Sequence, residues 1–124
     1  MAIRVGATRV GLALALAVAT SVPAMAAPGD GFSAFWPKFA AAAARDDAKA
    51  LASMTVLSSE FGEDSSFAKL HADLLRPEAR RCLAKAKPDY DAGSTSYNVV
   101  CRQMIYVFTK AAGGWKFTSI SPDD

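Results

Sequence analysis

His71 is the only histidine of this 124-residue chain, and its side chain is the one best suited to move a proton near neutral pH. It falls within residues 67–75, where the apolar side chains share one face of a predicted helix, so we expect the imidazole to point inward. A functional interpretation makes it a general base or proton shuttle in a cavity. The alternative is a histidine at the edge of the core, hydrogen-bonded to backbone.

Acid–base chemistry would also need a carboxylate in an apolar setting, which raises its pKa. No acidic residue lies on an apolar stripe: Asp46 and Asp47 have the positions of helix caps, and Asp89 and Asp91 flank a predicted turn. Asp46 is the expected cap, accepting hydrogen bonds from the first N–H groups of the helix that follows. The DYDAG sequence resembles part of a calcium loop, but no glutamate follows Glu78 to complete it. We expect no metal, no cofactor and no catalytic residue.

Large aromatic side chains offer a different chemistry, the binding of a small hydrophobic or amphipathic ligand. The expected ligand-binding residues are Trp36, Phe39, His71 and Tyr106. The alternative is that these aromatic rings are simply core.

The two cysteines, Cys82 and Cys101, are expected to form a disulfide, because an even pair in an exported protein meets an oxidising compartment. Such a bridge contributes about 3 kcal/mol in the chain-entropy model. Two buried free thiols are the alternative.

Export is indicated by the first residues, in which Arg4 and Arg9 precede an apolar run at residues 10–18. Ala24-Met25-Ala26 fits a cleavage site, so residues 1–26 are predicted to be a signal peptide and residues 27–124 a single domain, periplasmic or secreted. A membrane anchor is the alternative, but the apolar run is about half the length of a spanning helix.

Removing Arg4 and Arg9 leaves twelve basic residues against twelve acidic ones, so the mature domain has no net charge. This balance argues against nucleic acid or an anionic membrane as partner. The bases Arg80, Arg81, Lys85 and Lys87 form a local patch, which is most often a solvated face.

The elements that must position these residues are helices first and strands afterwards. Aromatic spacing predicts a helix over residues 31–45, a second over 47–54, a third that starts near residue 64 or 65, and a fourth over 77–86. Residues 89–96 are predicted to be loop. Residues 97–110 and 115–119 are predicted to be two strands joined by a Gly-Gly loop, with a further strand from residues 55–61 or 85–90. Residues 104–108 are apolar at every position, so both faces of that strand are expected to be covered.

The aromatic helix and the last hairpin carry a resemblance to a known family. The opening and the ending from residue 106 to 117 resemble the nuclear-transport-factor-two-like superfamily, the cone-shaped α+β domains shared with ketosteroid isomerase and scytalone dehydratase. The opening residues that match are Phe35, Trp36, Phe39, Asp46, Asp47, Leu51, Ala52, Met54 and Thr55. The resemblance implies an exported bacterial member in which N-terminal helices pack on a curved, cone-like antiparallel sheet. It also implies a cavity lined by one face of residues 104–108, and dimerisation through the outer face of the sheet.

Together these observations predict an exported, non-enzymatic α+β domain that binds a small ligand or a partner protein, with a homodimer as one form of the latter. One alternative is an isomerase- or dehydratase-type enzyme, which needs a carboxylate or tyrosine within reach of a cavity shared with His71. Another is an inhibitor or immunity-type protein, which predicts an exposed apolar patch or a protruding loop at residues 58–64 or 89–96.

Overall fold

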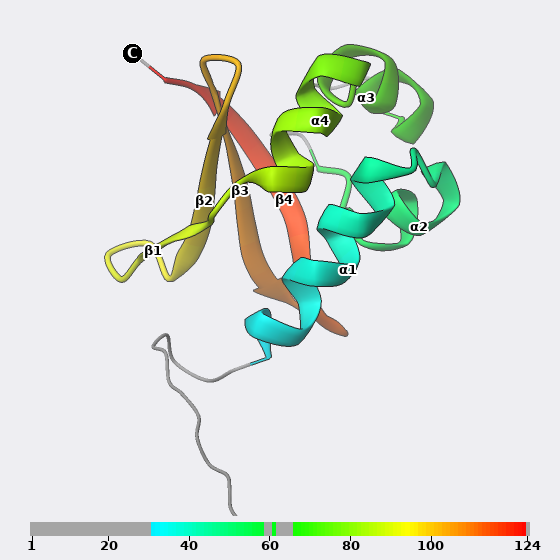
Figure 1. Cartoon of the computed structure of the whole chain (residues 1–124). Helices are drawn as coiled ribbons and strands as arrows, with labels where there is room; N and C mark the ends of the chain where they lie inside the picture. The colour runs from blue at the N-terminus through cyan, green and yellow to red at the C-terminus, as the bar shows by residue number, and fades with distance from the viewer. Residues whose placement is uncertain (1–30, 59–60, 62–65, 124) are drawn as a thin grey trace, which may run out of the picture. The chain divides into compact units, whose positions relative to one another are not determined.

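The computed structural model describes residues 31–58, 61 and 66–123 (Figure 1). The predicted signal peptide, and the predicted start of the third helix at residue 64 or 65, lie outside these residues. The described part is α+β, with four helices followed by a four-stranded antiparallel sheet, as predicted. In chain order the elements are α1 (Phe32–Ala44), α2 (Ala48–Ser53), α3 (Phe67–Leu74), α4 (Pro77–Lys85), β1 (Asp89–Asp91), β2 (Ser96–Cys101), β3 (Met104–Ala111) and β4 (Gly114–Pro122). Within these ranges, no helix combines the length and the hydropathy that a membrane crossing requires.

The sheet is a meander in which each strand pairs with the next along the chain, in the order β1-β2-β3-β4. The prediction of one strand over residues 97–110 is wrong, because the chain turns at Arg102 and Gln103 and so separates β2 from β3. Both turn residues have positive φ, 56° and 66°, which suits the tight turns that join antiparallel strands. Arg102 therefore lies in a turn and not in a strand.

The loop predicted at residues 89–96 is partly strand. Residues 89–91 form β1, which pairs with β2 from Asp89 opposite Asn98 to Asp91 opposite Ser96. The expected extra strand thus comes from the end of the 85–90 segment. The other candidate segment contributes as well, since Thr55 makes a single parallel bridge to Phe117 at the free edge of β4.

Alternate residues of β2, β3 and β4 face the helices and form the core with α1. The Phe32 ring stacks on Tyr97 with the ring centroids 3.7 Å apart, and the Phe39 ring meets Phe108 edge-on at 5.0 Å. The aromatic stripe of α1 therefore packs on the sheet, as its spacing predicts.

Two helix caps differ from the prediction, those of α2 and α3. Asp47, not Asp46, caps α2, and its carboxylate accepts a hydrogen bond from the Ala50 N–H at 3.1 Å. Asp46 has a φ of 53°, which turns the chain between α1 and α2 and points its side chain elsewhere. The α3 helix is capped by Ser66, whose hydroxyl accepts from the Lys69 N–H.

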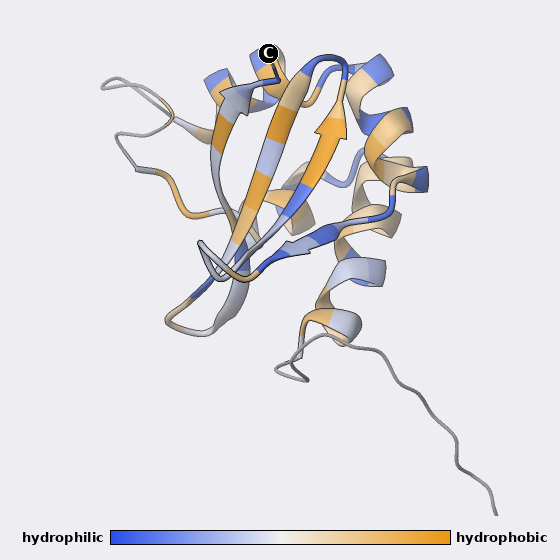
Figure 2. Cartoon of the chain, turned by 90° about the vertical axis from the view of Figure 1, so that its left-hand side faces the viewer, coloured by the Kyte–Doolittle hydropathy of each residue, from blue (hydrophilic) through white to orange (hydrophobic). Residues whose placement is uncertain are grey.

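The second face of the sheet, which we call the outer face, carries Val100, Ile105 and Val107. All the described helices lie on the opposite side, as Figures 1 and 2 show together. The expectation that both faces of residues 104–108 are covered is thus not met by the described residues, since Ile105 and Val107 stay partly exposed.

Candidate functional site

Two of the four predicted ligand-binding residues lie together in the aromatic cluster of α1. The Trp36 ring stacks on Phe39 at 5.7 Å and meets Phe108 edge-on at 5.4 Å. Phe39 has none of its surface exposed to solvent. The neighbours of these side chains are other rings, which is the arrangement of a packed core.

Tyr106 is the third predicted residue, and it lies deeper in the sheet. Only 2% of its surface is exposed, and its hydroxyl donates a hydrogen bond to the Leu74 carbonyl oxygen at 2.6 Å. Burial raises the pKa of Tyr106 to about 12, because the charged phenolate would lose its hydration. The hydrogen bond of this hydroxyl joins β3 to the end of α3.

His71 is the fourth predicted residue, and its partner is Asp46. The His71 Nε2 lies 2.7 Å from an Asp46 carboxylate oxygen, and the Arg80 Nε lies 3.5 Å from the same oxygen. The hydrogen bond from His71, with Arg80 nearby, holds the pKa of Asp46 below its usual value. The cluster therefore joins α3 and α4 to the α1–α2 turn, which explains why Asp46 does not cap α2.

Three of the cavities lined by described residues can be compared with the four predicted residues, and none of the three brings the four together. Tyr106 borders one of about 300 Å³; Trp36, Phe39 and His71 border none of the three. The Tyr106 cavity is lined by Asp73, Leu74, Arg76, Glu78, Ala79, Arg102, Met104 and Tyr106. Another, of about 550 Å³, lies between α1 and α2 and is lined by Pro37, Lys38, Ala41, Arg45, Ala50, Ser53 and Met54.

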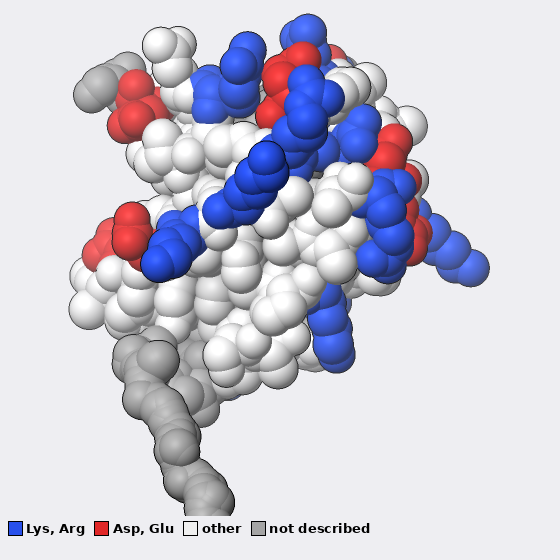
Figure 3. Space-filling view, in the orientation of Figure 1, with Lys and Arg blue, Asp and Glu red and all other residues white. Residues whose placement is uncertain are grey.

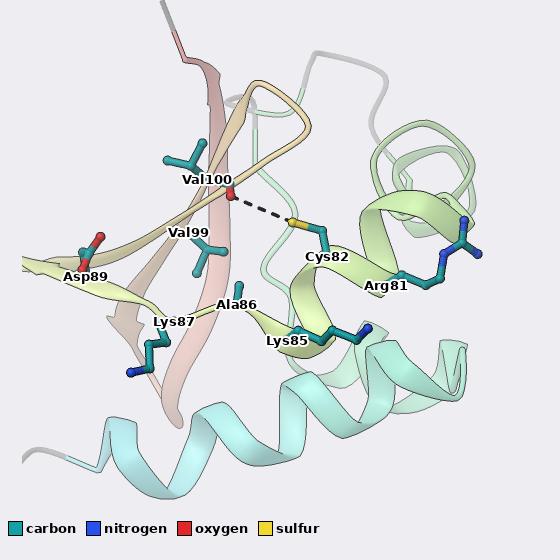
Figure 4. A pocket seen from close by; sticks show the side chains of 8 residues that line it. All are labelled: Arg81, Cys82, Lys85, Ala86, Lys87, Asp89, Val99 and Val100. Carbon is teal, nitrogen blue, oxygen red and sulfur yellow. Dashed lines mark hydrogen bonds between the residues drawn. The ribbon is translucent and has the colours of Figure 1, made fainter.

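The remaining cavity is an open groove of about 430 Å³ between α4 and the edge of β2, which we call the α4–β2 groove (Figure 4). It is lined by Arg81, Cys82, Lys85, Ala86, Lys87, Asp89, Val99 and Val100. Its two walls are joined by the predicted disulfide, which is confirmed, with the Cα atoms of Cys82 and Cys101 5.9 Å apart.

The helical wall of the groove carries three cations that have no acidic partner. Arg81, Lys85 and Lys87 are exposed, and among the described residues none of them forms an ion pair. Elsewhere arginines do find carboxylates: Arg45 pairs with Asp47, for example. Lysine and arginine side chains gather in a band across this side of the molecule in Figure 3. The groove therefore presents positive charge that the described residues leave without an ion pair.

The strand wall of the groove ends in an exposed apolar residue. Val100 is 54% exposed, the most of any large hydrophobic residue in the described part. Pairing with β1 stops at Asn98, so Val100 lies on an open edge of the sheet. Its carbonyl oxygen is 4.0 Å from the Cys82 sulfur, the contact dashed in Figure 4, and a disulfide sulfur has no proton to donate. The contact is therefore not a hydrogen bond.

Sequence reasoning identified half of this site. The basic residues of α4 were recognised as a patch, and the Cys82–Cys101 pair was predicted. The prediction of one strand over residues 97–110 hides the open edge at Val100. The pairing of the cysteines predicts that the fourth helix lies beside the first strand of the final hairpin, and α4 does lie beside β2.

Chemistry that needs a metal has no visible support in residues 31–58, 61 and 66–123, where no three potential ligands from His, Cys, Asp or Glu come together. Comparisons with protein-family models, with curated proteins and with solved structures find no match to this chain.

Proposed function

We propose that this chain is an exported, non-enzymatic domain that binds a partner protein through the outer face of its sheet. The observation that carries the proposal is that Val100, Ile105 and Val107 lie together on that face, exposed or partly exposed, and no described helix covers them. Exposed apolar side chains gathered on one face are typical of protein–protein contacts.

Binding of a small hydrophobic ligand is the other form of the proposal, at Trp36, Phe39, His71 and Tyr106. Two observations favour the partner protein. The rings of Trp36 and Phe39 contact other rings, and the Tyr106 hydroxyl is already bonded to Leu74. A ligand at these residues would have to displace side chains that already pack together.

An isomerase or dehydratase would need a cavity beside the histidine. His71 and Asp46 are within hydrogen-bond distance of each other, but neither borders any of the three cavities described above. An inhibitor or immunity-type protein is one kind of partner-binding domain, and the exposed Val56 and Leu57 add apolar surface that such a protein could use.

The proposal includes export by a signal peptide at residues 1–26 and membership of the nuclear-transport-factor-two-like superfamily, with its curved, cone-like sheet. Disulfide formation supports export, because such bonds persist in oxidising compartments. The aromatic contacts of α1 with β3 and β4 support the family, because its first helix packs on its sheet in the same way.

Site-specific photo-crosslinking tests the proposed surface in bacterial cells that express the full chain. A photoreactive amino acid at Ile105 or Val107 is expected to give a discrete crosslinked product, and one at the exposed Lys49 of α2 is the matched control. A product of twice the mass of the mature chain identifies a homodimer, and any other discrete mass identifies a partner. Equal products at all three positions, or none, would contradict the proposal.

Two further measurements on the same cells test the remaining parts. Fractionation and the mass of the intact protein are expected to show a periplasmic chain that begins at residue 27. Native mass spectrometry is expected to show no bound small molecule. A retained hydrophobic compound that is lost on Trp36→Ala would favour the ligand form instead.

A further inference from the structure

We propose that the α4–β2 groove binds an extended acidic segment of the partner protein, in which acidic and apolar side chains alternate. This inference rests on the proposed function, because Val100 belongs both to the outer face and to the groove. The outer face and the groove are therefore adjacent, and a partner that covers the outer face can also contact the groove.

The cations of the groove form a row. Arg81 and Lys85 are four residues apart on α4, so they lie one turn apart on the same side of the helix. The chain leaves the helix in an extended conformation at Ala86, with ψ of 157°, and Lys87 continues the row. In Figure 4 the Arg81 and Lys85 side chains extend from α4 away from β2, and Lys87 extends from the segment after the helix, so the three cations lie at the solvent-exposed rim of the groove. Such a row matches carboxylates spaced along an extended chain.

Among the described residues, no carboxylate forms an ion pair with this row. Asp89 lines the groove, but it forms no ion pair with Arg81, Lys85 or Lys87 among the described residues. Three positive groups against one negative group leave the groove basic, although the mature domain has no net charge. Negative charge on the binding partner would complement these cations, and it would raise the association rate as well as the affinity.

The apolar part of the groove favours a protein segment over a simple anion. Ala86, Val99 and Val100 line the groove, and an inorganic anion would leave that apolar lining in water. A uniform polyanion would also meet the Asp89 carboxylate at close range. A segment that alternates acidic and apolar residues satisfies both walls, because its side chains point alternately to opposite sides.

The disulfide makes the groove a fixed receptor. The bond between Cys82 and Cys101 holds the helical wall against the strand wall, and Leu83, the next residue of α4, is fully buried. Because the helical wall is already fixed, it loses little conformational entropy when a ligand binds. More of the contact energy is then available for affinity.

The test uses the protein recovered from the periplasm of cells that express the full chain, and two labelled octapeptides as probes. One peptide alternates Glu and Val, and the other alternates Gln and Val. Fluorescence anisotropy is expected to show at least tenfold tighter binding of the Glu–Val peptide at low salt, and a strong loss at 0.5 M salt.

Matched variants locate the binding. The groove variant combines Arg81→Gln, Lys85→Gln and Lys87→Gln, and the control variant combines Lys49→Gln, Lys69→Gln and Lys110→Gln, all at exposed positions. The groove variant is expected to lose at least tenfold in affinity for the Glu–Val peptide, and the control variant less than twofold. Equal losses in the two variants would overturn the proposal, since net charge alone would then explain binding.

Two other anions serve as competitors. Pyrophosphate that displaces the peptide at equal concentration would show a small-anion site, and vesicles with 30% phosphatidylglycerol that bind the wild type but not the groove variant would show a membrane site. Either result overturns the proposal. Its failure is distinct from failure of the proposed function: crosslinks at Ile105 without peptide binding leave the outer face as the interface, and the reverse result leaves only the groove.

Discussion

Val99 and Val100 are neighbours on β2, yet the two faces of the sheet place them in opposite surroundings. Val99 points toward the helices and is 1% exposed, whereas Val100 points to the outer face and is 54% exposed. On the inner face, rings from α1 fill the space against β3 and β4. On the outer face and in the α4–β2 groove, apolar and basic side chains have no described partner. The comparison teaches that the inner face stabilises the fold, while the other side is free to make contacts outside the domain.

The largest expected effect comes from the inner face. Phe39→Ala removes a fully buried ring and should lower the free energy of unfolding by about 3–5 kcal/mol, because a cavity remains among the neighbouring rings. Urea unfolding measures the change, with the exposed neighbour Lys38→Ala as a control expected to stay within about 0.5 kcal/mol. If Phe39→Ala unfolds the domain outright, Phe39→Leu gives a smaller, measurable loss. A Phe39→Ala protein as stable as the wild type would show that the cluster is not a packed core.

The disulfide joins the two regions, so its removal should have the next largest effect. Replacing both Cys82 and Cys101 by Ser is expected to lower the free energy of unfolding by about 3 kcal/mol. The reason is that a cross-link between residues 19 positions apart no longer restricts the unfolded chain. Thermal or urea unfolding measures it. Wild-type protein in excess reductant should match the double variant, and a stability that does not depend on reductant would contradict the prediction.

The two valines provide a direct test of the comparison. Val99→Ala should lower the free energy of unfolding by about 2 kcal/mol, from lost apolar burial and the cavity left behind. Val100→Ala should change it by less than about 0.5 kcal/mol, because its side chain is largely in water already. Equal losses would mean that the outer face is covered within the domain.

Replacing Tyr106 is expected to have a smaller effect than replacing Val99, and one with a characteristic pH dependence. Tyr106→Phe leaves the Leu74 carbonyl without its donor and should cost about 1–2 kcal/mol at neutral pH. Because burial raises the pKa of Tyr106 from 10.0 to about 12, the unfolded chain loses this proton first as the pH rises. Wild-type stability relative to Tyr106→Phe should therefore be constant below pH 10 and decrease between pH 10 and about 12. Urea unfolding of both proteins across this range measures the difference, and a constant difference would contradict it.

Much of the fold could be predicted because its signals are local. The spacing of Phe32, Trp36 and Phe39 defines the buried side of α1, and the two glycines at residues 113 and 114 have the positive φ that the last hairpin needs. Pro77 marks the first turn of α4. These features depend on neighbours in sequence, so composition and spacing are enough to find them.

The turn at Arg102 and Gln103 could not be predicted in the same way. Neither residue type is typical of a turn with positive φ, and the flanking strands pair closely enough to hold them there. The role of Asp46 was missed for a similar reason, since its bond to His71 joins residues 25 positions apart. The candidate site depends on both kinds of information, because its basic residues are local to α4 but the strand edge beside them is set by the pairing of distant segments.

The bond between Cys82 and Cys101 has a consequence for when the protein can act. Before the two thiols are oxidised, no covalent bond other than the intervening chain joins the helix to the strand edge beside it. If the groove is a receptor, its competence is then acquired after translocation, and a copy retained in a reducing cytosol would have little affinity for an acidic segment. The same cross-link that steadies the domain would in that way confine its activity to the compartment in which it is meant to work.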